Sequence, residues 1–316
     1  MVQERTGGDP MSEKKWVRAS LRQLSRELGE AGHTASPPTV GRLLGKLGFA
    51  LRANVKSEEA GSKHPDRDTQ FTYIAERKAA FLTAGDPVIS VDTKKKDLIG
   101  NFKNGGQAWG AQPETVNVHD FPSDAQGRAV PYGIYDVAKN QGWVVVGQSA
   151  DTPEFAVDAV ARWWEEEGRA RYPEAKRLLI LADGGGSNAA RSRVWKQQGQ
   201  AQLADRLGLE VTVCHYPRGC SKYNPVEHRL FSFISLNWAG KPLRSFEAML
   251  GFIRNTTTAA GLKVQAVLND KVYATGRQVS DAEMQTLNLE RHAVCPHWNY
   301  TIRPRLAGAQ SCQPGS

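Results

Sequence analysis

Three acidic residues stand where apolar segments of the chain end. Asp92 and Asp183 each close a run of aliphatic residues, and Glu227 follows the pair Asn224-Pro225. Such runs, ending at turn signals, are typical of buried strands, and ligands bind in open α/β sheets outside the carboxyl ends of strands. Two of the carboxylates can therefore face one pocket. Two divalent ions about 3.5–4 Å apart need several oxygen ligands, so a third carboxylate favours the metal site of a phosphoryl-transfer nuclease.

Each acid also has an ordinary structural explanation. Asp at the end of a strand starts turns and caps helices. If Asn224 caps a helix that begins at Pro225, Glu227 is its third residue, where a glutamate can reach back to the cap and suits the helix dipole. The hypothesis of a metal site depends on the three residues as a set.

Other acids compete for the same roles. Asp120 follows a strand-like stretch and is the first substitute, Asp136 lies within a predicted strand, and Asp151 is better explained as a helix cap. The glycine turn after Asp183 suggests an anion site at a helix start. Neither GxGxxG nor GxxxxGK[ST] is present, so dinucleotide and P-loop sites are disfavoured, and close approach of a DNA backbone is the better use of these glycines.

Composition bounds the class of protein. The chain has 316 residues and 40% hydrophobic content, enough for one large core and a small accessory domain. Lys and Arg outnumber Asp and Glu by 41 to 33, which gives a net charge of +8 and favours a polyanionic partner. No apolar stretch approaches the roughly 18 residues of a spanning helix, and the start lacks an apolar signal core. We expect a soluble, intracellular protein.

The cysteines do not form a recognisable framework. Four in a chain of this length are too sparse for a disulfide scaffold, so we expect reduced thiols. A zinc site is disfavoured because no CxxC pair exists and neighbours on a strand point to opposite faces, which also argues against a Cys-His nucleophilic pair. The residues that such a zinc site would draw on are Cys214, His215, Cys220, Cys295 and His297.

Two short helical patterns lie near the start of the chain, at 20–28 and 39–47. Ser36 can cap the second helix, with Pro37 at its first position. The arrangement is typical of a helix-turn-helix, and Arg42, Lys46 and Arg52 supply cations along and after the second helix. Since the connection is longer than usual, a plain helical hairpin with a solvated basic face remains the alternative.

The order of the later elements predicts the fold. Three strands are followed by helix, strand, helix, strand and helix, with the helices expected at about 151–164, 188–207 and 225–236. This is the βββαβαβα order of an α/β, ribonuclease-H-like domain with a mixed sheet, in which the first and fourth strands are central neighbours. Asp92 would then lie beside Asp183. The predicted parts are a disordered lead-in (1–13), a helix-turn-helix domain (14–56), a linker and helix (57–84), the catalytic domain (85–260) and a C-terminal extension (261–316).

Several motifs occur together in the chain: Asp92–Lys96, Gly100–Asn104, Val116–Phe121, Pro131–Asp136, Ala182–Asn188, Ser221–Phe231, Thr256–Thr258 and Trp298–Ile302. In combination they resemble one family, the Rhodopirellula-type DDE transposases of bacterial insertion sequences. The likeness spans about 9–304, and its Asn-Pro-Val-Glu piece is also similar to the Tc/mariner group.

The resemblance implies that Asp92, Asp183 and Glu227 form a DDE triad. Asp92 would contact two Mg²⁺ (or Mn²⁺) ions and the other two acids one each, for cleavage and strand transfer of double-stranded DNA by a homodimer or larger assembly in the bacterial cytoplasm, at the nucleoid. Family members carry more sequence ahead of Gly8, so an N-terminally truncated copy is also expected. Candidate phosphate contacts are Lys94, Lys95, Lys96, Lys103 and Arg218.

Three alternatives stay open. A ribonuclease-H-like nuclease would share the triad but would not join strands. A truncated, inactive copy would only bind DNA. A nucleotide-binding metabolic enzyme would leave the N-terminal helices unexplained.

Overall fold

The computed structural model describes residues 6–8, 15–17, 19–50 and 64–305. The chain divides into two compact units, Met1–Gly61 and Ser62–Ser316. No helix within the described ranges is both long and apolar enough to cross a membrane.

The smaller unit contains the two predicted helices, α1 (Leu21–Glu30) and α2 (Pro37–Lys46). Ser36 caps α2, its Oγ accepting from the backbone N–H of Thr39 at 3.4 Å, with prolines in the first turn as predicted. One strand, β1 (Thr6–Gly8), pairs antiparallel with β2 (Lys15–Val17). The prediction of a disordered lead-in is therefore wrong at residues 6–8, because a backbone ladder holds them, and 1–5 and 9–13 lie outside the described residues.

The larger unit is built on one mixed sheet flanked by helices. Its strands are β3 (Val88–Thr93), β4 (Asp97–Ile99), β5 (Gly127–Asp136), β6 (Gln141–Gly147), β7 (Arg177–Ala182), β8 (Glu210–His215), β9 (Lys263–Asn269), β10 (Leu289–Arg291) and β11 (Asn299–Ile302). Its main α-helices are α3 (Arg67–Ala84), α4 (Pro153–Trp163), α6 (Arg193–Gln198), α7 (Ser232–Asn237) and α8 (Phe246–Arg254). Further helical segments are η2 (Pro122–Asp124), η3 (Trp164–Gly168), α5 (Arg169–Arg171), η4 (Gly186–Asn188), η5 (Gly199–Asp205), η6 (Ser221–Tyr223), η7 (Glu227–Phe231) and α9 (Asp281–Gln285).

The strand order confirms the predicted ribonuclease-H-like arrangement. The sheet runs β10-β11-β8-β7-β3-β5-β6-β9, with β4 paired to β5. β3 lies parallel to β7 and antiparallel to β5, so the first and fourth core strands are central neighbours. Their register sets Val91 opposite Ala182. The residues that follow, Asp92 and Asp183, therefore leave the sheet side by side.

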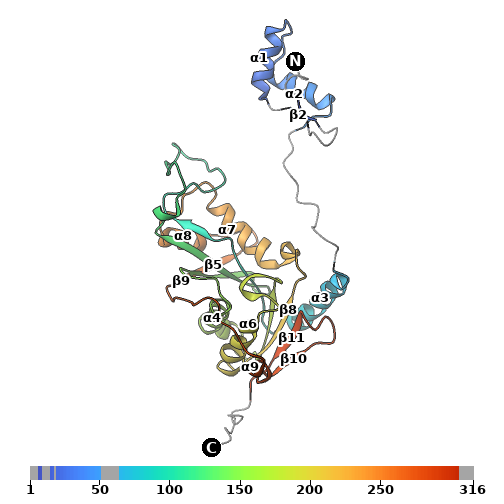
Figure 1. Ribbon diagram of the computed structural model, residues 1–316, viewed down its shortest axis with the longest axis vertical. Helices are drawn as coiled ribbons and strands as arrows, with labels where there is room; N and C mark the ends of the chain where they lie inside the picture. The colour runs from blue at the N-terminus through green and yellow to red at the C-terminus, as the bar shows by residue number, and fades with distance from the viewer. Residues whose placement is uncertain (1–5, 9–14, 18, 51–63, 306–316) are drawn as a thin grey trace, which may run out of the picture. The chain divides into compact units, whose positions relative to one another are not determined.

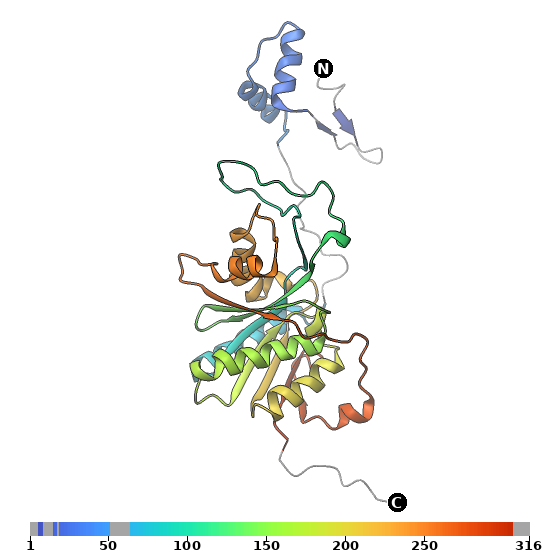
Figure 2. The ribbon, with the colours of Figure 1, turned by 90° about the vertical axis from the view of Figure 1, so that its left-hand side faces the viewer.

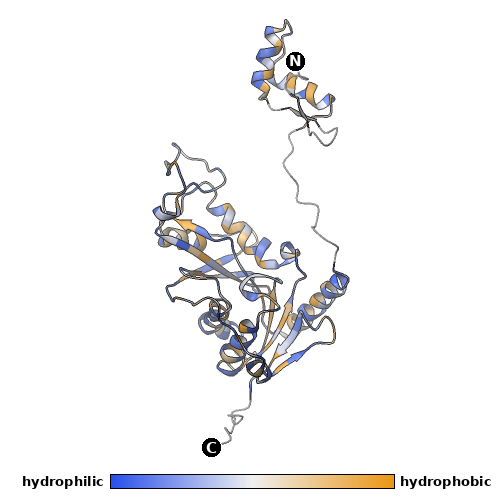
Figure 3. Cartoon of the chain, in the orientation of Figure 1, coloured by the Kyte–Doolittle hydropathy of each residue, from blue (hydrophilic) through white to orange (hydrophobic). Residues whose placement is uncertain are grey.

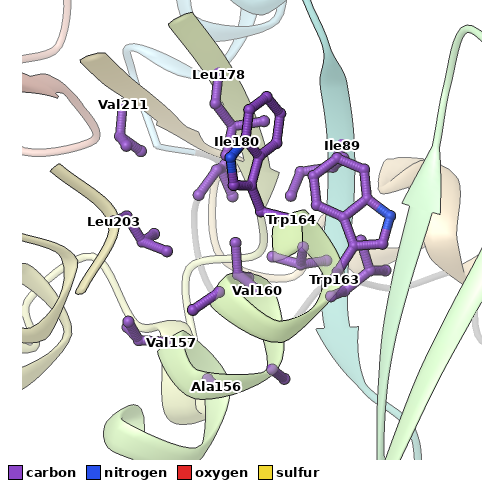
Figure 4. Packing of buried hydrophobic residues seen from close by; sticks show 14 of the residues in the cluster. Ile89, Ala156, Val157, Val160, Trp163, Trp164, Leu178, Ile180, Leu203 and Val211 are labelled. Carbon is purple, nitrogen blue, oxygen red and sulfur yellow. The ribbon is translucent and has the colours of Figure 1, made fainter. Parts of the chain in front are cut away.

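Helices cover both faces of this sheet. In two perpendicular views α4 and α6 lie on one face and α7 and α8 on the other (Figures 1 and 2). The strands are hydrophobic where they meet the helices, whereas α3 alternates hydrophobic and hydrophilic residues (Figure 3). On the α4 side Trp163 and Trp164 pack with Ile89, Leu178 and Ile180 (Figure 4).

Two boundaries differ from the sequence-based expectation. The helix expected at 188–207 begins only at Arg193, because η4 and a turn separate it from β7, and Ser192 rather than Asn188 caps it. Beyond residue 260, β9 extends the sheet beside β6 and β11 extends it beside β8. The described part of the predicted C-terminal extension is thus built into the sheet, because backbone pairing is satisfied there.

Candidate active site

The first two carboxylates lie at the ends of the two central strands. Asp92 is the fifth residue of β3, and its side chain accepts a hydrogen bond from Thr93 N at 2.7 Å. Asp92 is 8% exposed and Asp183 is partly buried. The Oδ1 atom of Asp183 accepts from Gly185 N at 3.2 Å. Both carboxylates therefore keep oxygen atoms that are not used by the fold.

The third carboxylate, Glu227, is positioned by a set of buried hydrogen bonds around Asn224, which we call the Asn224 lock. Ser90 Oγ donates to Asn224 Oδ1 at 2.5 Å, and Asn224 Nδ2 donates to the carbonyl of Val91 at 3.0 Å. Val226 N in turn donates to Ser90 Oγ at 2.8 Å. Asn224 thus ties the start of the helix to β3 instead of capping that helix with its side chain. The prediction that Asn224 is the N-cap is wrong in this respect, and Glu227 begins the π-helical turn η7.

Close packing brings this helix onto the sheet. At Gly133 on β5, the partner of Asp92 in the strand register, an added methyl group would lie 2.3 Å from the ring of Phe231 and 3.2 Å from Val226. A side chain there would push η7 away from β3. π-Helical turns are uncommon and occur often at functional sites. Here the turn carries Glu227 toward the strand ends.

The three acids interact strongly with one another. Burial, the charge of Asp183 and the charge and hydrogen-bonding contact of Glu227 together raise the pKa of Asp92 to about 8, against the lowering effect of the Thr93 N–H. Burial also raises the pKa of Asp183, with the charges of Glu227 and Asp151 acting in the same direction. Like charges held together in a low-dielectric place favour the bound proton. A cation in the cluster would favour the ionised forms instead.

The donor set fits hard divalent cations. Its side-chain ligands are carboxylate oxygens, which Mg²⁺ and Mn²⁺ prefer. Tyr132 adds a second observation, because its hydroxyl is buried beside this charge without a hydrogen-bond partner. Burial and the charges of Asp92 and Asp151 raise the Tyr132 pKa.

A chain of hydrogen bonds between buried side chains, which we call the His215 relay, ends at the backbone carbonyl of Asp183 and holds that residue in place. His215 Nδ1 donates to the backbone carbonyl of Asp183 at 3.0 Å, and Tyr300 donates to His215 Nε2 at 3.2 Å. The Tyr300 hydroxyl accepts from Trp195 Nε1 at 2.9 Å. Burial lowers the pKa of His215 to about 4, which agrees with a neutral ring in this relay. Sequence reasoning noted Tyr300 only within a motif, since the contact spans three distant segments.

A fourth acid, Asp151, also reaches the site. It accepts from Thr93 Oγ1 at 3.1 Å and pairs with Lys96 Nζ at 3.5 Å. The prediction that Asp151 caps the next helix is wrong, because Thr152 caps α4 by accepting from Phe155 N. Two adjacent polar residues could both have served as cap, and only packing selected between them.

The other candidate acids do not join the cluster. Asp120 is exposed on the connection between β4 and β5. Asp136 is buried at the opposite end of β5, where it accepts from the hydroxyl of Tyr172 at 2.9 Å. These positions remove both as substitutes for the three acids.

The predicted phosphate contacts fall into two groups. Lys94 is largely buried, lies 4.7 Å from the centre of the Trp238 ring and pairs with Asp97 at 3.8 Å. Burial lowers the Lys94 pKa, against the charges of Asp97 and Glu227. Lys94 thus differs from Lys95 and Lys96, which are exposed. The exposed candidates are Lys95, Lys96, Lys103 and Arg218, and in the smaller unit Arg42 and Lys46 are exposed while Arg52 lies outside the described residues.

A groove opens beside Asp183. It measures about 370 Å³ and is lined by the glycine turn after Asp183, by Arg191 and Ser192, and by the loop that carries Arg218. Glycines keep side chains out of its floor, and two arginines supply positive charge next to the acidic cluster. A phosphate backbone can approach such a surface closely.

A ribonuclease-H-like sheet with carboxylates meeting at its central strand ends is the arrangement of metal-dependent phosphoryl-transfer enzymes. The chain belongs to the family described as Rhodopirellula transposase DDE domain, whose family model matches residues 1–304. It is therefore classed among the DDE transposases.

Comparison with solved structures gives looser likenesses. The Mos1 transposase paired-end complex with left transposon end is 14% identical, with a TM-score of 0.44, and the match covers 75% of this chain and 66% of that chain. The mariner Mos1 paired end complex with Mg is 13% identical, with a TM-score of 0.46, over 78% of this chain and 74% of that chain. The chain thus spans about two thirds of the length of the first of these. A search of curated proteins found no match.

Proposed function

We propose that this protein cuts DNA and transfers the cut strand by metal-dependent transesterification, with Asp92, Asp183 and Glu227 as the catalytic acids. One observation carries the proposal: carboxylates from β3, β7 and η7 meet in a partly buried cluster that raises the pKa of Asp92 to about 8. Such repulsion destabilises the fold by itself and is relieved when cations bind. Perturbed carboxyl groups in a cleft are typical of functional sites.

The acids would hold two Mg²⁺ or Mn²⁺ ions. Asp92 interacts with both other carboxylates and would be a ligand of both ions, with Asp183 and Glu227 each holding one. When bound, the ions supply Lewis-acid activation of the attacking hydroxyl and neutralise charge on the phosphate. The buried lock at Asn224 and the relay through His215 fix two of the three ligands before any ion arrives.

The remaining residues of the site would bind DNA. Arg191 and Arg218 line the groove beside Asp183 and would contact phosphates of the strand that is cut. Lys94 would act differently, because its buried ammonium lies near Glu227 and balances negative charge there. The partner would be double-stranded DNA carrying the ends of an insertion sequence.

The helical unit and the assembly state complete the proposal. The exposed Arg42 and Lys46 of α2 would contact DNA phosphates. Holding two DNA ends requires at least two copies of the chain on DNA. We expect the protein at the bacterial nucleoid.

The test is cleavage and strand transfer on DNA that carries the flanking element's ends, with Mg²⁺ or Mn²⁺. Activity should require metal and be lost in Asp183→Asn, while Asp120→Asn, which changes an exposed acid away from the cluster, keeps it. Metal-independent activity, or equal activity of Asp183→Asn and the unchanged protein, would refute the assignment. Cleavage without joining would identify a nuclease, and binding without cleavage by any variant an inactive copy.

A further inference from the structure

A second group of potential metal ligands lies away from the acidic cluster. His64, Asp66 and His297 each present one ligand atom, and these atoms lie within 4.8 Å of one another; within the described residues no other three His, Cys, Asp or Glu side chains meet so closely. His64 and Asp66 immediately precede α3, and His297 belongs to the loop before β11. The group therefore joins two segments more than 200 residues apart in sequence.

Within this group two hydrogen-bond acceptor atoms, His64 Nδ1 and Asp66 Oδ2, face one another. His64 Nδ1 lies 3.8 Å from Asp66 Oδ2, and it accepts a long hydrogen bond of 3.3 Å from the backbone N–H of Asp66. In that tautomer both the nitrogen and the carboxylate oxygen are acceptors, so nothing in the pair bonds them directly. A cation bound through this nitrogen would replace its long hydrogen bond from Asp66 N–H and would also bind the carboxylate oxygen.

Asp66 is not used by the helix that it precedes. Its position is the N-cap of α3, where an aspartate normally accepts from the first turn, yet its side chain makes no capping hydrogen bond. The carboxylate is directed instead toward the two imidazoles. A helix cap without its usual bond is a second observation that points to a ligand role.

Both imidazole rings are held in place by one indole. The rings of His64 and His297 lie 4.7 Å and 4.3 Å from the buried ring of Trp298, centre to centre. The two imidazole centres are 5.7 Å apart. Two imidazoles bound to one tetrahedral zinc ion have centres about 5 Å apart, given nitrogen–zinc distances of about 2.0–2.1 Å. Small side-chain movements would therefore close the site.

We propose that His64, Asp66 and His297 bind a zinc ion that clips the start of α3 to the loop before β11. Nitrogen ligands favour zinc over Mg²⁺, which prefers oxygen, so this site would be chemically distinct from the acidic cluster. Solvent would occupy the fourth position, because both histidines are exposed.

The clip would steady the relay behind Asp183. One helical turn after Asp66, Gln70 Nε2 donates to the carbonyl of His215 at 2.8 Å and to Asn299 Oδ1 at 2.8 Å. Asn299 directly follows Trp298 in the loop that carries His297. Fixing the start of α3 on this loop would thus hold Gln70 against Asn299, at the start of β11, and against the carbonyl of His215 on the neighbouring strand β8.

The experiment measures zinc content and zinc affinity of the full chain in buffer with excess Mg²⁺. We expect one zinc ion per chain, an affinity reduced by about 100-fold or more in His64→Ala and His297→Ala, and unchanged zinc binding in His119→Ala and Asp183→Asn. His119 is an exposed histidine outside the group, and Asp183→Asn separates zinc at this site from zinc in the acidic cluster. Far-ultraviolet circular dichroism checks that each variant folds.

Two outcomes would overturn the proposal. The unchanged protein could bind no zinc, in which case the group is an ordinary contact between surface side chains. Alternatively, zinc could bind equally to the unchanged protein and to the His64 and His297 variants, which would place the ion elsewhere.

Discussion

Asp92→Asn should stabilise the metal-free protein. The pKa of Asp92 is about 8 in the folded chain against an ordinary value of 3.8. At pH 7 that difference corresponds to about 4 kcal/mol of lost stability, because the unfolded chain ionises freely and the folded chain does not. An asparagine does not ionise and can still accept from Thr93 N and donate to Glu227. We expect a gain of about 2–4 kcal/mol, the smaller value applying if the surroundings relax around the charge.

The sign of the pH dependence is specific. A carboxyl whose folded pKa is raised costs little stability below pH 4, and the cost grows as pH rises from about 4 to about 8. The difference between Asp92→Asn and the unchanged protein should therefore widen over that range and level off above it. Added Mg²⁺ should remove most of this difference, because ions stabilise only the protein that binds them, by about 2.7 kcal/mol at a hundredfold and about 4.1 kcal/mol at a thousandfold excess over Kd.

The assay is urea unfolding with a chelator, followed by tryptophan fluorescence, which reports mainly the larger unit because every tryptophan except Trp16 lies in it. Asp120→Asn is the matched control, since that acid is exposed. A difference that is absent at pH 7, or that stays constant from pH 5 to pH 8, would refute the electrostatic account of the site.

Four further predictions concern the surroundings of the acids. Asn224→Ala should lower the cleavage rate about 10–100-fold and weaken the Mg²⁺ dependence, because the lock on the glutamate-bearing helix is lost; an unchanged metal titration would contradict this. Gly133→Ala should destabilise the protein by about 1–3 kcal/mol in urea unfolding, since the added methyl group overlaps an aromatic ring. The contribution of His215 to the free energy of unfolding should fall by up to about 3 kcal/mol between pH 6.5 and pH 4, because burial lowers its pKa to about 4; the difference in this free energy between the unchanged protein and His215→Asn should therefore change by that amount over this range. Arg218→Ala should weaken DNA binding alike for all sequences and reduce the slope of log affinity against log salt by about 1.

Much of the fold was predictable because it depends on local patterns. Mainly aliphatic runs that stop at an acidic residue indicate where β3 and β7 end, since a strand buried on both faces is mostly apolar; the one polar residue inside β3, Ser90, is buried and hydrogen-bonded to Asn224. The order of strands and helices then predicts which strands are neighbours. The pairing of Val91 with Ala182 follows from that order and brings Asp92 next to Asp183.

Other features could not be predicted because several residues fit the same local role. Asp151 and Thr152 are both good helix caps, and the structure uses Thr152 for the cap and directs Asp151 to Thr93. Lys94 belongs to a run of three lysines that looks uniformly solvated, yet the packing of Trp238 buries the first of them. Neither choice is visible in spacing, because each depends on a segment distant in sequence.

The sequence by itself determined the positions of Asp92, Asp183 and Glu227 at element ends, the adjacency of the first and fourth core strands, and the family. Only the tertiary structure decided how those acids are held, through Asn224 bonded to β3 and His215 bonded to the carbonyl of Asp183. Burial and periodicity give local patterns of apolar and polar residues along the chain, and strand ends can be predicted from those patterns. Hydrogen bonds between buried side chains depend on which segments meet in space, and that is fixed only when the whole sheet has formed.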